Sequence, residues 1–296
     1  MKKTFVMLLA AAFAVFSLNA AENKATAANA EKATAPKAEK TAAKKPAKKT
    51  AKKAHVLPAD GGMKACTTAT PRQNPKAQKQ SAWHKRYAEK AKQIADYKND
   101  VEIVFIGDSI THYWDVDCKT TKKKIGGLAT YNKYFSKYRL INLGYSGDRT
   151  QHALWIAAKS PYLNNIKPKM VSVMIGTNSV AYNRSTPEAT AAGITKVVEA
   201  LRARLPETKI LLFAVFPRDA KANAVHRAKI KTVNSIICKL ADDKNVFYCD
   251  ITDKFLDKKG NLPKTLMPDL LHPNDAGYEI WAQAMMPYVE KFVGKK

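Results

Sequence analysis

Five short apolar runs, separated by stretches of helical character, constrain this chain more than any other feature. They lie at residues 101–106, 140–143, 170–175, 210–216 and 245–249. Near-continuous apolar runs of this length are typical of strands that are buried on both faces. The alternation therefore predicts a parallel sheet with helices on both sides, which is an α/β fold with three layers, α/β/α.

The stretches between these runs carry helix signals. Thr186, Pro187 and Glu188 combine an N-cap residue, a first-turn proline and an acid near the positive end of the helix dipole. They predict a helix that ends before Pro206. Further helices are expected at residues 83–97, 222–240 and 275–293. Since ligands bind beyond the carboxyl ends of parallel strands, the loops after the apolar runs are where we look for a site.

The first 75 residues have a different character. Residues 1–21 combine two lysines, an apolar stretch and small residues, which predicts a cleavable signal peptide and a secreted or periplasmic protein; an uncleaved anchor is the alternative. Residues 22–54 hold no aromatic side chain and no aliphatic one larger than Ala. Such a segment cannot bury enough surface to offset its ordering entropy, so a disordered basic tether is expected. We expect residues 22–75 to form tether and linker, and a single domain to span residues 76–296.

The basic charge is not confined to the tether. Of the net charge of +26, residues 1–21 carry +2 and residues 22–54 carry +7, which leaves +17 for the rest. Such a field favours polyanions, although a solvated lysine-rich surface is the plainer interpretation. Export argues against a specific nucleic-acid partner. The tail is expected to bind an anionic wall, glycan or membrane surface, or to act only as a spacer. No apolar run beyond the N-terminus could span a bilayer, which argues against a polytopic membrane protein.

Four cysteines are too few for a disulfide scaffold, and they lack the paired spacing of a zinc site. Cys238 and Cys249 are the pair that export would make most interesting, but four cysteines allow three connectivities. No cluster of histidines and acids suggests a metal. Neither a metal nor another cofactor is therefore expected.

Polar or glycine-rich segments follow the first three apolar runs and precede the last predicted helix. Ser109 is the expected nucleophile, at a strand-to-helix turn. His272 would act as its general base, and Asp269 would hold the other imidazole nitrogen. The Ser109 N–H, the Gly144 N–H and the Asn178 amide would form the oxyanion hole, and Gly144 would let substrate approach its backbone closely.

Several residues nearby compete for these roles. Ser146 is a rival nucleophile, because its surroundings nearly match a G-x-S-x-G elbow. His112 and His152 are rival bases. Asp108 is expected to position the turn rather than to transfer protons. Arg149 would form an ordinary ion pair or meet an acidic substrate, and the ion pair is the favoured interpretation.

Four segments match, in order, the four sequence blocks of the SGNH (GDSL) hydrolases: Gly107-Asp108-Ser109, Gly144, Gly176-Thr177-Asn178 and Asp269-x-x-His272-Pro273. The chain resembles this family from about Trp83 to Phe292. It is closer to the group that includes the catalytic subunits of platelet-activating-factor acetylhydrolase and many exported bacterial esterases. The resemblance implies a flavodoxin-like, five-stranded parallel sheet and metal-free ester hydrolysis. It also implies Ser109, Asp269 and His272 as triad, and Ser109, Gly144 and Asn178 as oxyanion hole.

The leading hypothesis is an exported serine esterase that removes short acyl groups, acetyl above all, from a glycan. Three alternatives stay open. The chain could hydrolyse phospholipid-like esters, in the manner of a lysophospholipase or a platelet-activating-factor acetylhydrolase. It could transfer acyl groups between sugars through a Ser109 acyl-enzyme. It could also be a non-catalytic polyanion-binding protein that works through residues 22–54. The sequence does not indicate the oligomeric state.

Overall fold

An all-parallel sheet of five strands forms the centre of the chain. The computed structural model describes residues 57–76, 81–181 and 184–296, so the predicted signal peptide and basic tether lie outside the described residues. The strand order is β2-β1-β3-β4-β5, and the strands are β1 (Ile103–Gly107), β2 (Leu140–Gly144), β3 (Met170–Met174), β4 (Lys209–Phe213) and β5 (Val246–Cys249). This is the predicted flavodoxin-like arrangement.

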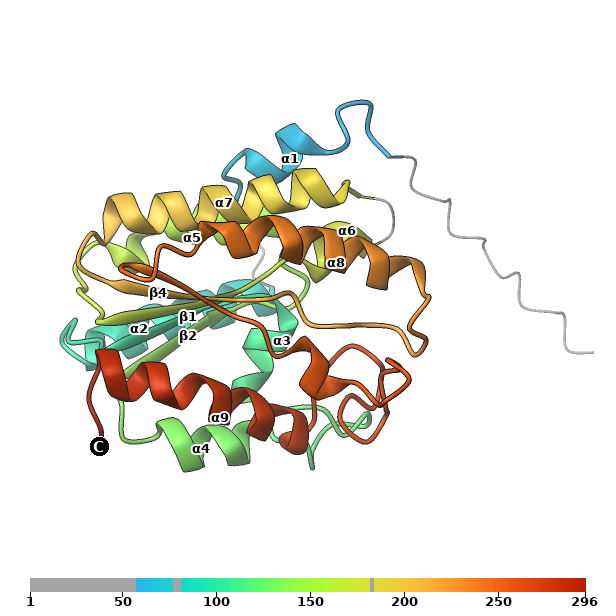
Figure 1. Ribbon diagram of the computed structural model, residues 1–296. Helices are drawn as coiled ribbons and strands as arrows, with labels where there is room; N and C mark the ends of the chain where they lie inside the picture. Colours follow the sequence, from blue (N-terminus) through green and yellow to red (C-terminus); the bar gives the residue numbers. More distant parts are fainter. Residues whose placement is uncertain (1–56, 77–80, 182–183) are drawn as a thin grey trace, which may run out of the picture. The chain divides into compact units, whose positions relative to one another are not determined.

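Helices cover both faces of the sheet, which confirms the three-layer α/β/α architecture. One face carries α2 (Ala82–Asp96), α5 (Thr150–Ala158), α7 (Pro187–Arg204) and α8 (Val225–Ile237). The other carries α4 (Leu128–Phe135) and α9 (Asp275–Phe292). Figure 1 shows α5, α7 and α8 above the sheet, and α4 and α9 below it. Short helices make up the rest: α1 (Met63–Thr67), α3 (Ser109–His112), α6 (Thr177–Val180), and 3-10 turns at Tyr113–Asp115, Pro161–Leu163, Cys238–Leu240 and Thr252–Phe255.

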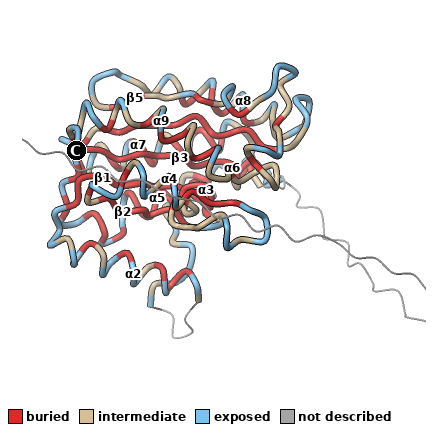
Figure 2. Tube along the Cα trace, turned by 90° about the horizontal axis from the view of Figure 1, so that it is seen from below, coloured by how far each residue is buried: buried red, intermediate tan, exposed pale blue. Residues whose placement is uncertain are grey.

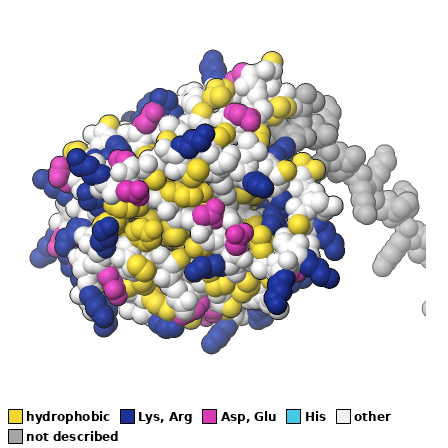
Figure 3. Space-filling model, in the orientation of Figure 1, with side chains coloured by type: hydrophobic (Ala, Val, Ile, Leu, Met, Phe, Trp, Pro, Cys, Tyr) yellow, Lys and Arg dark blue, Asp and Glu magenta, His cyan; other side chains and the backbone are white. Residues whose placement is uncertain are grey.

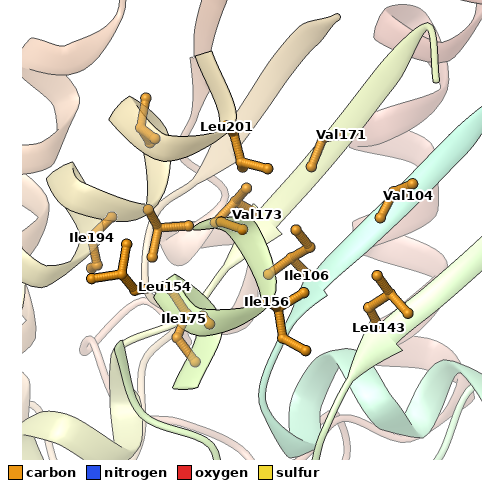
Figure 4. Close-up of a cluster of buried hydrophobic side chains, with 14 of the residues drawn as sticks. Val104, Ile106, Leu143, Leu154, Ile156, Val171, Val173, Ile175, Ile194 and Leu201 are labelled. Carbon is orange, nitrogen blue, oxygen red and sulfur yellow. The ribbon is translucent and has the colours of Figure 1, made fainter. Parts of the chain in front are cut away.

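The strands are buried on both faces, as their composition predicts. Every residue of β1, β2 and β3 is buried, and Figure 2 shows the strands in the red, buried centre of the molecule. Alternate side chains enter opposite cores: Val104 packs with the α5 and α7 layer, whereas Phe105 packs with the α4 and α9 layer. Figure 4 shows the first core, where Val173 of the sheet lies near Leu201 of α7, and Ile106 near Ile156 of α5. Packing in the two cores fixes the sheet from both sides, so the carboxyl ends of the strands lie along one rigid edge.

Residues 57–76 belong to the folded unit rather than to a linker. Helix α1 contacts α5 and α7. Cys66 is buried, and its carbonyl accepts a hydrogen bond from Thr150 Oγ1 at 3.2 Å. The expected linker up to residue 75 and domain start at residue 76 are therefore wrong. The segment has no hydrophobic periodicity because a single short turn, held by tertiary contacts, needs none.

Gly193 allows this close packing of α1, α5 and α7. A Cβ atom at this position would lie 2.5 Å from Thr150 Oγ1 and 2.8 Å from the Cys66 carbonyl oxygen. Alanine is better than glycine by about 1 kcal/mol in an exposed helix. Here we expect the opposite: Gly193→Ala should lower the free energy of unfolding by about 1–3 kcal/mol, because the core is overpacked. Urea denaturation measures the change, and a stabilised variant would contradict the prediction.

All four cysteines are free thiols, so the Cys238–Cys249 pair is not bridged in this structure. In the three described ranges, no helix combines the length and the apolarity that crossing a bilayer requires. Figure 3 shows lysine and arginine side chains spread around the margins of one face, with hydrophobic and acidic side chains between them. This face therefore presents no single patch of positive charge.

Candidate active site

Ser109 lies at the turn where β1 leads into α3. Asp108 is the N-cap of this short helix, and its Oδ1 accepts a hydrogen bond from the Ile110 N–H at 3.0 Å. Asp108 is fully buried, and burial, the largest effect, raises the pKa of its carboxyl to about 6. Asp108 thus positions the turn, as expected, and Ser109 presents its hydroxyl at the carboxyl edge of the sheet with 6% of its surface exposed.

The structure brings Ser109, His272 and Asp269 into one hydrogen-bonded series. Ser109 Oγ lies 2.7 Å from His272 Nε2. His272 Nδ1 lies 2.9 Å from Asp269 Oδ2. In this arrangement the imidazole can take the hydroxyl proton on one side while the carboxylate fixes the other nitrogen as an N–H donor.

A short turn before α9 holds the acid and the base of this series together. Besides the ring contact, the His272 N–H donates to Asp269 Oδ1 at 2.8 Å. Leu270, between them, adopts a left-handed conformation with φ of 62°. The turn ends at Asn274, whose side chain caps α9 by accepting a hydrogen bond from the Gly277 N–H. Both oxygens of one carboxylate therefore orient the same histidine.

Asp269 is held in its charged form. Partial burial would raise the pKa of its carboxyl, but the hydrogen bonds from the ring and the backbone of His272 outweigh burial and lower it. Lys123, an exposed side chain, adds an ion pair to Asp269 Oδ2 at 3.1 Å. A carboxylate that stays ionised can stabilise the imidazolium that forms when His272 accepts a proton.

Asn178 and Gly147 line one polar pocket at the carboxyl edge of the sheet. Asn178 is partly buried at the start of α6, and its amide donates one hydrogen bond to the Asp148 carbonyl oxygen at 2.9 Å, which leaves its second N–H available. Gly147 lines the same pocket and has a φ of 81°. Its N–H has no acceptor among the residues that the structure describes.

Gly144 does not join this set, contrary to the sequence-based expectation. Its N–H donates to Asn142 Oδ1 at 2.9 Å in the buried end of β2. A Cβ atom at Gly144 would lie 2.4 Å from the His112 backbone nitrogen, so glycine is required here by the close approach of α3. The prediction of Gly144 as an oxyanion donor is therefore wrong.

The rival candidates Ser146, His112 and His152 form hydrogen bonds outside the series of Ser109, His272 and Asp269. Ser146 Oγ lies 3.0 Å from His112 Nδ1, but no carboxylate hydrogen-bonds that histidine within the described ranges. Burial, followed by the charge of Arg86, lowers the pKa of His112 to about 4, so it is a weak base. His152 accepts a hydrogen bond from the Arg149 backbone N–H at 3.0 Å. Of the three histidines considered, His272 is the one hydrogen-bonded to both a serine and a carboxylate.

Three residues near the site are not predicted from the sequence to be functional candidates. Lys123 pairs with Asp269, and Gly147 lines the pocket of Asn178. Arg72, from the segment taken as linker, donates a hydrogen bond to the Gly147 carbonyl oxygen. Only Gly147 carried a signal, since it belongs to the glycine-rich segment that follows β2.

The chain is similar to known proteins in sequence and in fold. Residues 105–280 match the model of the GDSL-like lipase/acylhydrolase family. The platelet-activating factor acetylhydrolase IB subunit alpha2 of Rattus norvegicus is 30% identical over 186 residues, which cover 62% of this chain and 75% of that protein.

Solved structures share the fold. A GDSL-like lipase from Bacteroides thetaiotaomicron is 24% identical, with a TM-score of 0.54 over 70% of this chain and 97% of that one. A candidate acylhydrolase from Bacteroides fragilis is 22% identical, with a TM-score of 0.57 over 73% of this chain and 100% of that one. The resemblance to the SGNH hydrolases is thereby confirmed, and the chain belongs to the GDSL-like lipase/acylhydrolase family of esterases.

Proposed function

We propose that this protein is an exported serine esterase that removes short acyl groups, acetyl above all, from a glycan. The observation that carries the proposal is the series of contacts from Ser109 Oγ through His272 to Asp269. The signal peptide at residues 1–21 would direct export, and residues 22–54 would act as a basic tether in the wall or periplasm.

In the proposed mechanism, Ser109 Oγ attacks the ester carbonyl carbon while His272 Nε2 takes its proton. The charge on the carbonyl oxygen would be stabilised by the N–H groups of Ser109 and Gly147 and by the Asn178 amide. His272 then donates the proton to the leaving alcohol oxygen, and the acyl group stays on Ser109. A water molecule, deprotonated by His272, releases the carboxylic acid in the second half of the reaction.

A phospholipid-like ester is the second candidate, because the relatives described above carry the name of platelet-activating factor acetylhydrolase. An enzyme that works on lipid surfaces benefits from exposed apolar side chains around its site. Among the described residues, the large hydrophobic side chains that are exposed are Leu57, Met63 and Val225. None of them lies on a loop that carries Ser109, Asn178 or His272. This observation favours a water-soluble substrate.

The test is hydrolysis of p-nitrophenyl esters from acetyl to decanoyl, together with acetate release from acetylated polysaccharides, by the full chain. The proposal expects the acetyl ester to be the best of the series and at least one polysaccharide to release acetate. Activity that rises steadily with chain length would favour the lipid candidate. A folded protein that turns over no ester would refute both.

Asn178→Ala tests the proposed oxyanion hole. Removing one donor from such a site costs about 10²–10³-fold in kcat. We expect this loss with p-nitrophenyl acetate, with little change in KM, because the hydrogen bond would form mainly in the transition state. Steady-state kinetics measure both constants. A loss confined to KM would show that Asn178 only helps to bind the substrate.

A further inference from the structure

A polar pocket of about 380 Å³ opens beside Asn178, next to the proposed oxyanion hole. Its lining is dominated by arginines that come from three separate segments of the chain. The residues are Arg72, Gly147, Arg149, His152, Asn178 and Arg184. The folded unit therefore gathers three guanidinium groups in one pocket, although they come from separate parts of the sequence.

Two of the three arginines of this pocket make no ion pair among the described residues. Neither Arg72 nor Arg149 has a carboxylate oxygen within 4.0 Å in the part of the chain that the structure describes. The ion pair that was favoured for Arg149 from the sequence is thus not formed. Burial, and then the charges of Arg184 and Arg72, lower the pKa of Arg149. The arginines repel one another, and this repulsion would be relieved by a bound anion.

Two titratable groups in or under the pocket do not change this balance. Asp148 is buried with one unbonded carboxylate oxygen, and burial raises its pKa well above the usual range despite the charge of Arg72. Burial, then Arg149, Arg72 and Arg184, lowers the pKa of His152 to about 3, so this imidazole is neutral. The histidine adds no charge, and one acid lies beside three arginines, so the pocket keeps a positive sign.

Specific contacts also fix the positions of the residues that line the pocket. Arg72 donates a hydrogen bond to the Gly147 carbonyl oxygen. A Cβ atom at Gly147 would lie 2.7 Å from Arg72 Nη2, and the φ of 81° also favours glycine at this position. The N-terminus of the nine-residue helix α5 begins at Thr150, directly after Arg149, and its dipole favours negative charge on the same side. Helix, loop and N-terminal segment together present donors to an anion.

We propose that this pocket is an anion-binding subsite that holds a carboxylate, sulfate or phosphate group of the ester substrate beside the scissile bond. The inference rests on the proposed esterase function. An acetyl group carries no charge, so the anion would belong to the alcohol part of the substrate, such as an acidic sugar next to the acetylated one. Guanidinium groups bind such planar or tetrahedral oxyanions through paired hydrogen bonds.

The experiment compares an anionic ester with a neutral one. The full chain is assayed with para-acetoxybenzoate, its methyl ester and para-acetoxyphenyl phosphate, and each kcat/KM is divided by the uncatalysed rate of the same ester. We expect a preference of about tenfold or more for the anionic esters, which shrinks as salt is raised. A larger preference for the phosphate would indicate a phosphorylated substrate, and a larger preference for the carboxylate would indicate an acidic sugar.

Substitutions test whether the preference for anionic esters depends on the arginines of the pocket. Arg149→Gln should lower the ratio of anionic to neutral kcat/KM about tenfold, and Arg149→Lys should restore only part of it, since an ammonium lacks the paired donors. Lys137→Gln, which removes an exposed positive charge elsewhere, should keep the wild-type ratio. Circular dichroism checks that each variant is folded. Calorimetry of phenyl phosphate with Ser109→Ala, and with Ser109→Ala combined with Arg149→Gln, measures binding without turnover.

The outcomes separate this inference from the function on which it rests. Equal normalised rates for charged and neutral esters, or a preference that survives in Arg149→Gln, would overturn the anion subsite while leaving the esterase intact. If no ester is hydrolysed faster than by Ser109→Ala, the proposed function fails instead. Binding of phenyl phosphate that does not depend on Arg149 would also count against the subsite.

Discussion

Ser109→Ala and His272→Ala are each expected to lower kcat for p-nitrophenyl acetate about a thousandfold or more. Ser109 Oγ and His272 Nε2 are 2.7 Å apart, so the hydroxyl and the base act as one unit. Loss of either member of such a unit removes covalent catalysis and leaves only the contribution of binding and the oxyanion donors. The double variant should therefore be scarcely slower than either single variant. Steady-state rates of all three, measured beside the wild type, test this.

A matched control is available on a neighbouring loop. Ser146 is exposed and lies 3.0 Å from His112 Nδ1, so Ser146→Ala breaks another serine–histidine contact close to the site. We expect its rate to stay within about threefold of the wild type. If Ser146→Ala instead caused the larger loss, the assignment of the nucleophile would have to be exchanged.

Asp269→Asn is expected to lower kcat by about 10³–10⁴-fold, as substitution of the triad acid does in serine proteases. The asparagine carbonyl can still accept the His272 backbone N–H, which keeps the turn in place. Its amide N–H would then face His272 Nδ1 and favour a proton on Nε2. That nitrogen could no longer accept the Ser109 proton. The loss should therefore appear in kcat while the fold and KM stay nearly unchanged.

The control for Asp269→Asn is Asp219→Asn. Asp219 Oδ2 lies 2.8 Å from His226 Nδ1, which makes a similar acid–histidine pair, and no serine of the described ranges hydrogen-bonds this histidine. Its rate should stay within about threefold of the wild type. A wild-type rate in Asp269→Asn would mean that Asp269 shapes the turn but gives the imidazole no electrostatic help.

The strands and the nucleophile turn could be predicted because their signals are local. A strand buried on both faces has to be apolar along its length, and Ser109 follows such a run directly. Helix α5 was not predicted, for a related reason. Residues 150–157 are buried on every side, so α5 has no polar face and no amphipathic period to detect.

The hydrogen-bond donors around the pocket could not be predicted, because the sequence pattern does not show in which direction each backbone N–H points. Gly144 and Gly147 lie in the same segment, and no sequence pattern shows that the Gly144 N–H is taken up by Asn142 Oδ1. Arg72 was unpredictable because its position follows from the packing of α1 against α5 and α7. That packing depends on Gly193, more than a hundred residues away in sequence.

The contact between Ser109 and His272 joins residues 163 positions apart, whereas Asp269 and His272 belong to one turn. All the strand pairs are parallel, so each is closed by a long crossover rather than by a hairpin. Contacts of such sequence separation form late and slowly, because the chain entropy of the intervening loop is lost first. During refolding from denaturant, the acid–base turn can form early, but ester hydrolysis has to wait for the first and last parts of the domain to meet. The recovery of ester hydrolysis would therefore report when the whole fold is complete. It should lag behind the recovery of the helical signal in circular dichroism.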